Sequence, residues 1–153
     1  MLDIAVKQAT RSVLRGVGTA RQSAPFNLDR AVDICRQSDS LLLPSGAPVG
    51  WEHLLVLGTY FVMREIELAL ARVSHLRIDK STASCTLQLP VSKKDPRALG
   101  CERTWQCLCR QGKGVRPDCP FHAAVSQLDL LKAKFGQELY LDLPLFPNEQ
   151  GVV

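Results

Sequence analysis

The sequence predicts an α+β fold, in which helices pack on a small three-stranded antiparallel sheet and a zinc-stapled loop is inserted after the third strand. Three observations support this prediction. Apolar residues recur at helical spacing over residues 51–73 and 123–135, and they alternate with polar residues over 76–79 and 85–89. Cysteine and histidine then cluster within residues 107–122. The first two patterns indicate the layers, and the third indicates the insertion.

The composition is that of one globular domain. The chain has 153 residues, of which 46% are hydrophobic and 22% charged, which excludes disordered, collagen-like and coiled-coil classes. No apolar run reaches the roughly 18–20 residues that a membrane-spanning helix needs, so we expect no membrane partner. The N-terminus lacks the order of a secretory signal, so we expect an intracellular protein, nuclear if eukaryotic. In that compartment cysteines stay reduced or hold metal, and disulfides are the weaker expectation.

The N-terminal part is predicted to stand apart from the domain. Residues 1–25 are typical of a basic helix and linker, the tail of an upstream segment, and residues 26–153 form the domain. Within it, Asn27 is expected to cap a short helix that buries Cys35, and residues 41–50 form a loop.

The central elements follow from the two periodicities. From Trp51 we predict two helices, with a break at Gly58 and Thr59. The alternating stretches predict two strands, and residues 102–108 return as a third. Pro120 is then expected to start a helix that Gly136 ends, and the apolar residues 139–146 are split by Pro144.

Positive charge is concentrated in the middle of the chain. The net charge is +4, yet residues 77–116 contain nine basic residues against three acidic ones. This distribution favours an anionic partner such as nucleic acid, and a solvated basic surface is the equal alternative.

Arg64 lies in an apolar stretch, where an unpaired guanidinium is costly to bury. Glu67 follows at the spacing of one helical face and is the expected partner. Two interpretations stay open. The pair is a helix ion pair, or Glu67 holds the planar donors of Arg64 toward a phosphate.

Three short motifs occur in the order in which a known protein family has them. Residues 58–67 read GTYFVMREIE, a later strand ends in LPVSK at Lys93, and residues 143–147 read LPLFP. This order resembles the catalytic domain of tyrosine recombinases (phage integrase-like enzymes), and more closely the integrase-like proteins of eukaryotic mobile elements. The resemblance covers about residues 24–151 and corresponds to the N-terminal portion of that domain. The glycine stands six residues before the arginine here, instead of the family's usual two.

The resemblance implies DNA recombination or integration, in which a tyrosine attacks a DNA phosphodiester. Arg64 would be the first phosphate clamp, Glu67 its orienting partner, and Lys93 the general acid, with Lys94 as the competing candidate. Such a site needs cations for the phosphate and a proton donor for the departing oxygen. The implied partner is double-stranded DNA, on which the full-length parent could assemble as a homo-oligomer, with Lys94, Arg97 and Arg103 as the DNA-binding residues.

The family's second half-site is not visible in this sequence. None of the three histidines has an arginine three residues later, and both tyrosines, Tyr60 and Tyr140, come before the position of the nucleophile. The chain by itself is therefore expected to be catalytically incomplete, and whether it is an enzyme stays open.

The cysteine and histidine cluster predicts a metal site. Cys107 and Cys109 form a C-x-C pair, and after nine intervening residues Cys119 and His122 form a C-x-x-H pair. Three thiolates and one imidazole are the ligand set of structural zinc, whose residual negative charge Arg110, Lys113 and Arg116 could offset. Reduced cysteines in a small core are the alternative, and Cys101 is a substitute ligand. Cys35 and Cys85 are expected to be buried.

Two other functions stay open from the sequence. One is a zinc-stabilised module that binds nucleic acid or an acidic protein through Arg110, Lys113 and Arg116, without catalysis. The other is a degenerate remnant that folds poorly.

Overall fold

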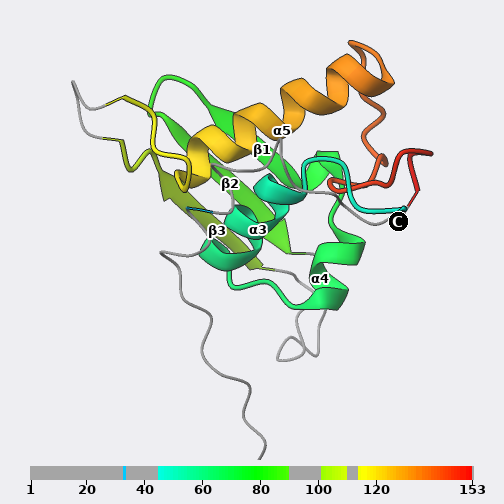
Figure 1. Ribbon diagram of the computed structural model, residues 1–153. Helices are drawn as coiled ribbons and strands as arrows, with labels where there is room; N and C mark the ends of the chain where they lie inside the picture. The colour runs from blue at the N-terminus through cyan, green and yellow to red at the C-terminus, as the bar shows by residue number, and fades with distance from the viewer. Residues whose placement is uncertain (1–32, 34–44, 90–100, 110–113, 153) are drawn as a thin grey trace, which may run out of the picture.

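The computed structural model describes residue 33 and residues 45–89, 101–109 and 114–152, and it confirms the α+β class (Figure 1). Two longer helices and a sheet form two layers, and a third, short helix lies at one end. The elements in chain order are α3 (Trp51–Tyr60), α4 (Glu65–Leu70), the 3-10 turn η2 (Val73–His75), β1 (Leu76–Asp79), β2 (Ser84–Leu89), β3 (Cys101–Gln106) and α5 (Pro120–Phe135).

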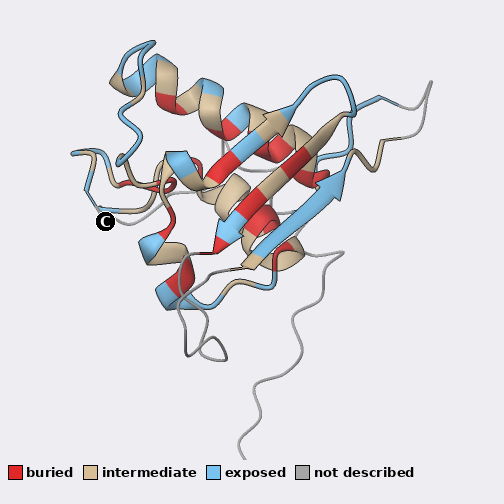
Figure 2. Ribbon diagram, turned by 180° about the vertical axis from the view of Figure 1, so that it is seen from behind, coloured by how far each residue is buried: buried red, intermediate tan, exposed pale blue. Residues whose placement is uncertain are grey.

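The three strands form an antiparallel sheet in the order β1-β2-β3. Leu76 pairs with Leu87, and Leu89 at the end of β2 pairs with Cys101 at the start of β3. Alternate residues of β2 are buried beneath the helices, which is why its sequence has a period of two. Seen from behind, in Figure 2, the sheet presents its opposite face with no helix over it.

The core lies between the sheet and helices α3 and α5. Its largest members each have less than 2% of their surface exposed, and burying one such side chain stabilises the fold by about 1.5–3 kcal/mol. They come from α3 and its C-cap, β2, α5 and the C-terminal segment, so no element packs without the others. These large apolar side chains are Leu57, Phe61, Leu87, Leu89, Leu131 and Leu145.

The prediction of two helices after Trp51 is confirmed, but the predicted break at Gly58 and Thr59 is wrong. Helix α3 continues through both residues to Tyr60, and within it Thr59 Oγ1 donates to the Leu55 carbonyl at 2.7 Å. An isolated glycine inside a helix costs only about 1 kcal/mol, which does not end it. The chain turns instead over residues 61–64, where Val62 has a left-handed φ of 52°.

The third strand is also shifted from its predicted span. It covers Cys101–Gln106 rather than 102–108. The Cys107 amide still donates to the Ala83 carbonyl at 2.8 Å, but from Cys107 onward the side chains turn toward the start of α5. The start of α5 at Pro120 and its end at Gly136, where φ is 107°, are as predicted.

The apolar stretch that Pro144 splits lies beside the chain between α4 and β1. The Val73 amide donates to the Leu143 carbonyl and the Leu145 amide to the Ala71 carbonyl, both at 2.9 Å. Pro144 pairs with Arg72 in a short antiparallel bridge. Proline has no backbone N–H to donate. This is tolerated because the flanking Leu143 carbonyl and Leu145 amide make the hydrogen bonds between the two segments.

Several predictions fall outside the described residues. These are the basic segment 1–25, the short helix capped by Asn27 with Cys35, and the residues Lys93, Lys94, Arg97, Arg110 and Lys113. Among the helices that the structure does describe, none has both the length and the apolar content needed to cross a bilayer.

Gln127 is a fully buried amide that joins three parts of the fold. Its Nε2 donates to the carbonyls of Leu145 at 2.7 Å and Val49 at 3.1 Å, and its Oε1 lies 2.9 Å from His53 Nδ1. His53 therefore belongs to this network. The close approach of Gln127 also requires Gly50, since a Cβ there would lie 1.9 Å from Oε1.

Replacing Gln127 with leucine is expected to destabilise the protein by about 2–3 kcal/mol, because two buried carbonyls lose their donor while the side-chain volume hardly changes. Urea denaturation measures the change. Gln106→Leu, at an exposed position in β3, is the matched control and should shift stability by less than about 0.5 kcal/mol. Equal effects of the two substitutions would contradict the role of the buried amide.

Candidate metal centre

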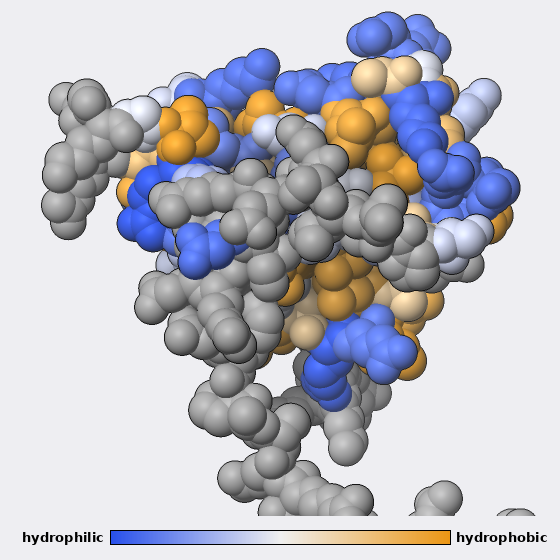
Figure 3. All heavy atoms as spheres, in the orientation of Figure 1, coloured by the Kyte–Doolittle hydropathy of each residue, from blue (hydrophilic) through white to orange (hydrophobic). Residues whose placement is uncertain are grey.

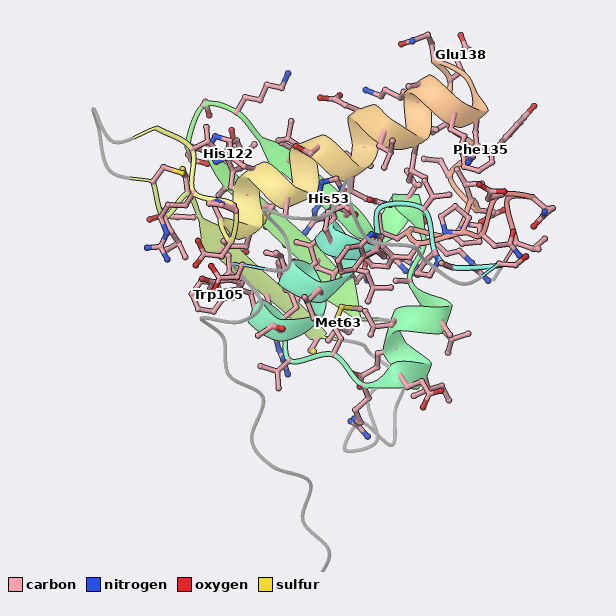
Figure 4. The ribbon with its side chains drawn as sticks, viewed as in Figure 1. His53, Met63, Trp105, His122, Phe135 and Glu138 are labelled. Carbon is pink, nitrogen blue, oxygen red and sulfur yellow. The ribbon has the colours of Figure 1, made fainter. Side chains whose placement is uncertain are left out.

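Cys107, Cys109, Cys119 and His122 converge at one end of the molecule, and we refer to them as the Cys/His group. Cys107 and Cys109 follow the last residue of β3, whereas Cys119 is the N-cap of α5 and His122 lies in its first turn. Figure 4 shows His122 at this end of α5, beside the chain that leaves β3. The four side chains come together because the end of β3 and the start of α5 meet at this end of the molecule.

The distances within the Cys/His group match those of a tetrahedral metal site. The four ligand atoms all lie within 4.8 Å of one another. His122 Nδ1 lies 3.3, 3.5 and 3.6 Å from the sulfurs of Cys119, Cys109 and Cys107, and the Cys107 and Cys119 sulfurs are 3.8 Å apart. Metal–sulfur and metal–nitrogen bonds of about 2.3 and 2.05 Å at tetrahedral angles give about 3.5 Å for S···N and 3.8 Å for S···S. The group can therefore hold a metal ion.

Backbone amides stabilise negative charge on the sulfurs. The amides of Leu108 and Arg116 donate to Cys119 Sγ and Cys109 Sγ at 3.3 Å, and the Cys109 amide donates to Cys107 Sγ at 3.4 Å. Since a thiolate is the form that binds metal, these amides favour the binding state of the ligands. The loop between the two pairs of ligands thus contributes donors, although few of its residues are apolar.

The pKa values of two cysteines in the group move in opposite directions. Burial raises the pKa of the Cys107 thiol. At Cys119 burial acts in the same direction but is outweighed by hydrogen bonds from the side chain and backbone of His122 and from the Leu108 amide, so the pKa falls to about 6. Cys119 therefore loses its proton before Cys107 does.

The remaining described cysteines lie outside the group. Cys85 is fully buried, as predicted, and burial raises the pKa of its thiol to about 11. Cys101, the substitute ligand considered from the sequence, instead begins β3 opposite Leu89. All five cysteines that the structure describes are free thiols.

Arg116 and Asp118 flank the group as an ion pair. Arg116 donates to the Asp118 carboxylate with Nε at 3.0 Å and Nη2 at 2.5 Å. These bonds from Arg116 hold the pKa of Asp118 below its usual range and raise that of Arg116. The arginine expected to offset the charge of the site is thus largely neutralised by its own neighbour.

Arg64 and Glu67 form the predicted pair, in an arrangement that the sequence did not indicate. Arg64 is the N-cap of α4 rather than a residue within a helix, and its amide donates to Glu67 Oε2 at 2.8 Å. Its Nη2 lies 3.1 Å from Glu67 Oε1. The Glu67 side chain is 6% exposed and the Arg64 side chain 49% exposed, so a buried carboxylate orients a guanidinium that reaches solvent.

The surroundings of Arg64 combine charged and apolar surface. Val62 and Ile66 are 72% and 61% exposed, and Leu70 is also exposed. In Figure 3 orange and blue surface lie next to each other in the lower right of the view, where Figure 1 shows α4.

Arg103, predicted from the resemblance to bind DNA, contacts the end of α3. Its Nη1 donates to the Phe61 carbonyl, and Trp105 Nε1 donates to the Tyr60 carbonyl at 2.9 Å. The sequence had given no role to Trp105, Asp118 or Gln127. A polar residue in the apolar stripe of α5 is a signal for Gln127, but no local signal marks the other two.

No family model matches this chain, and neither does any curated protein or solved structure. The side-chain geometry therefore carries the functional inference.

We expect metal-free protein, refolded under reducing conditions, to bind one Co²⁺ ion per chain with the visible bands of tetrahedral cobalt–thiolate coordination. The reason is the match between the four ligand atoms and tetrahedral spacing. Titration followed by absorption spectroscopy measures it. Cys109→Ser should weaken binding at least tenfold, while Cys85→Ser, outside the group, should leave it unchanged. Equal affinities in the two variants would rule out the proposed ligand set.

Proposed function

We propose that the Cys/His group is a structural zinc site. Three sulfurs and one nitrogen at tetrahedral spacing are a donor set that Zn²⁺ prefers, and four protein ligands leave no open position for substrate. Three thiolates and a neutral imidazole would give the site one net negative charge, which the backbone amides at the sulfurs help to stabilise. Bound zinc would link the end of β3 to the start of α5.

The protein purified without chelator is expected to contain one zinc ion per chain, measured by elemental analysis. Removing it with a chelator should lower the melting temperature by at least about 10 °C, because the free energy of binding a structural zinc is part of the folding free energy. A cooperative melt of the zinc-loaded protein would also argue against a poorly folding remnant. Absence of zinc together with an unchanged melt after chelation would refute this role.

We also propose that the chain binds double-stranded DNA as the first half of a tyrosine-recombinase-like catalytic domain. The observation that carries this proposal is the Arg64–Glu67 pair. A buried carboxylate fixes the fork of an arginine whose donors remain accessible, which is the arrangement that clamps a phosphate. A surface ion pair formed for stability alone would gain less than about 1 kcal/mol and would not require a buried partner.

The strand pairing bears on the second part of the proposed phosphate site, the lysines between β2 and β3. The hydrogen bond from Arg103 to the Phe61 carbonyl brings the turn at residues 61–64 close to β3. Arg103 lies two residues from Cys101, which pairs with the last residue of β2, Leu89. Residues 90–100, which join these paired strand ends, include Lys93, Lys94 and Arg97 in the sequence and lie outside the described residues.

In this proposal Arg64 binds the phosphate, Glu67 orients it, and Lys93 is the proton donor, with Lys94 as its competitor. The chain alone would bind DNA without cutting it, because the sequence has neither the H-x-x-R motif nor a later tyrosine. Assembly of copies on DNA and a nuclear location in a eukaryotic cell belong to the same proposal.

The competing function is a zinc-stabilised binding module that uses Arg110, Lys113 and Arg116. The bidentate bond of Arg116 to Asp118 makes this less favourable, since that guanidinium has a carboxylate partner already. Arg116→Ala tests this function in the binding experiment below.

Arg64→Ala is expected to weaken binding to duplex DNA about tenfold or more and to lower the slope of log affinity against log salt by about one phosphate contact. Fluorescence anisotropy at several salt concentrations measures both quantities. Arg77→Ala is the matched control, because Arg77 is an exposed arginine paired with Glu102 at 2.7 Å. If Arg64→Ala and Arg77→Ala behave alike, Arg64 does not bind phosphate. A loss confined to Arg116→Ala would favour the binding module.

A further inference from the structure

We propose that the metal centre positions the turn that carries Arg64, by means of a clamp on the C-terminal end of α3. The clamp consists of Tyr60, Arg103, Trp105 and Asp118. The role of the metal rests on the zinc site proposed above and the consequence for DNA on the proposed DNA binding, whereas the clamp itself can be measured without DNA.

One arm of the clamp is β3. Arg103 and Trp105 alternate along β3, so their side chains point to the same face of the sheet, and Cys107 directly follows the strand. The first two donate hydrogen bonds to the carbonyls of Phe61 and Tyr60, and the third is a metal ligand. The carbonyls at a helix end have no partner within the helix, and a cation there also complements the helix dipole. The strand that ends in the metal centre thus caps α3.

The second arm is the start of α5. Asp118 directly precedes the ligand Cys119, and its Oδ2 accepts a hydrogen bond from the Tyr60 hydroxyl at 3.4 Å. Burial, followed by the negative charge of Asp118, raises the pKa of Tyr60, so the phenol keeps its proton. The Tyr60 ring packs edge to face against Trp105, with centroids 5.2 Å apart. Tyr60 is therefore held by both arms at once.

The two arms are joined by the Cys/His group. Trp105 is two residues from Cys107, and Asp118 directly precedes Cys119. The sulfurs of Cys107 and Cys119 lie 3.8 Å apart. A metal ion held by Cys107 and Cys119 would fix the separation of the arms and hence the position of Tyr60 between them. Without the ion, no bond would join the two sulfurs, and the separation of the arms would depend on the surrounding contacts alone.

The turn that follows Tyr60 needs such support. Val62 adopts a left-handed conformation that is unfavourable for a β-branched residue, and its side chain is exposed, so burial does not hold it there. The amides of Val62 and Met63 bond to the carbonyls of Thr59 and Gly58 at 3.2 and 2.9 Å, which continue the last turn of α3. The position of Arg64, one residue further on, thus depends on the end of α3.

The test is hydrogen exchange of the zinc-loaded protein, with Trp105→Phe compared with Trp51→Phe. Trp105→Phe removes the N–H donor to the Tyr60 carbonyl and should speed exchange of the Val62 and Met63 amides about fivefold, the change expected for one lost hydrogen bond. Trp51→Phe makes the same substitution at the other end of α3 and should leave both amides unchanged. Equal exchange rates at these two amides in the two variants would overturn the proposal.

Two further measurements separate the possible failures. If Trp105→Phe does not fold, Tyr60→Phe is used instead. It removes only the hydroxyl that reaches Asp118 and should likewise speed exchange of the Val62 and Met63 amides. DNA binding is measured in parallel, and the dissociation constant of the clamp variant should rise about fivefold. If Arg64→Ala leaves DNA affinity unchanged, the DNA-binding function fails while the exchange result still decides the clamp. If Arg64→Ala weakens binding but the clamp variant changes neither exchange nor affinity, only the clamp fails.

Discussion

The convergence of three sulfurs and one imidazole on a common point is the constraint on which this end of the molecule depends. Strand β3 is an edge strand and has no buried side chain among its six residues, so hydrophobic burial does little to hold it. Its ladder with β2 fixes one side. The Cys/His group fixes its end against α5, and through Arg103 and Trp105 the strand in turn fixes the end of α3.

Helix α5 is held in two ways along its length. Its first turn carries two members of the Cys/His group, and its middle carries Gln127, which bonds to the segment before α3 and to the C-terminal segment. Both contacts are directional, unlike the apolar packing around them. Apolar packing in a small core stabilises the fold without strongly selecting how the packed elements are positioned along one another. Directional contacts specify one arrangement.

The three arginines near the functional candidates each have a polar partner, but the partners differ. Arg116 and Asp118 satisfy each other beside the Cys/His group, and Arg103 is used to cap a helix. Arg64 differs in its partner, because the Glu67 side chain is 6% exposed and that of Asp118 is 19% exposed, whereas the side chains of Arg64 and Arg116 are exposed alike. The proposed recognition of an anion rests on this arrangement, in which a buried carboxylate orients a guanidinium that reaches solvent.

The sequence by itself determined the fold class, the strand pairing, the limits of α5, the four members of the Cys/His group and the pairing of Arg64 with Glu67. These depend on periodicity, on proline and glycine at helix ends and on ligand spacing, which act over a few residues. Only the tertiary structure decided where α3 ends, where β3 stops and that Tyr60 lies between Trp105 and Asp118. Those contacts join residues 45 and 58 positions apart, and the buried packing that selects among such pairs leaves no local pattern in the chain.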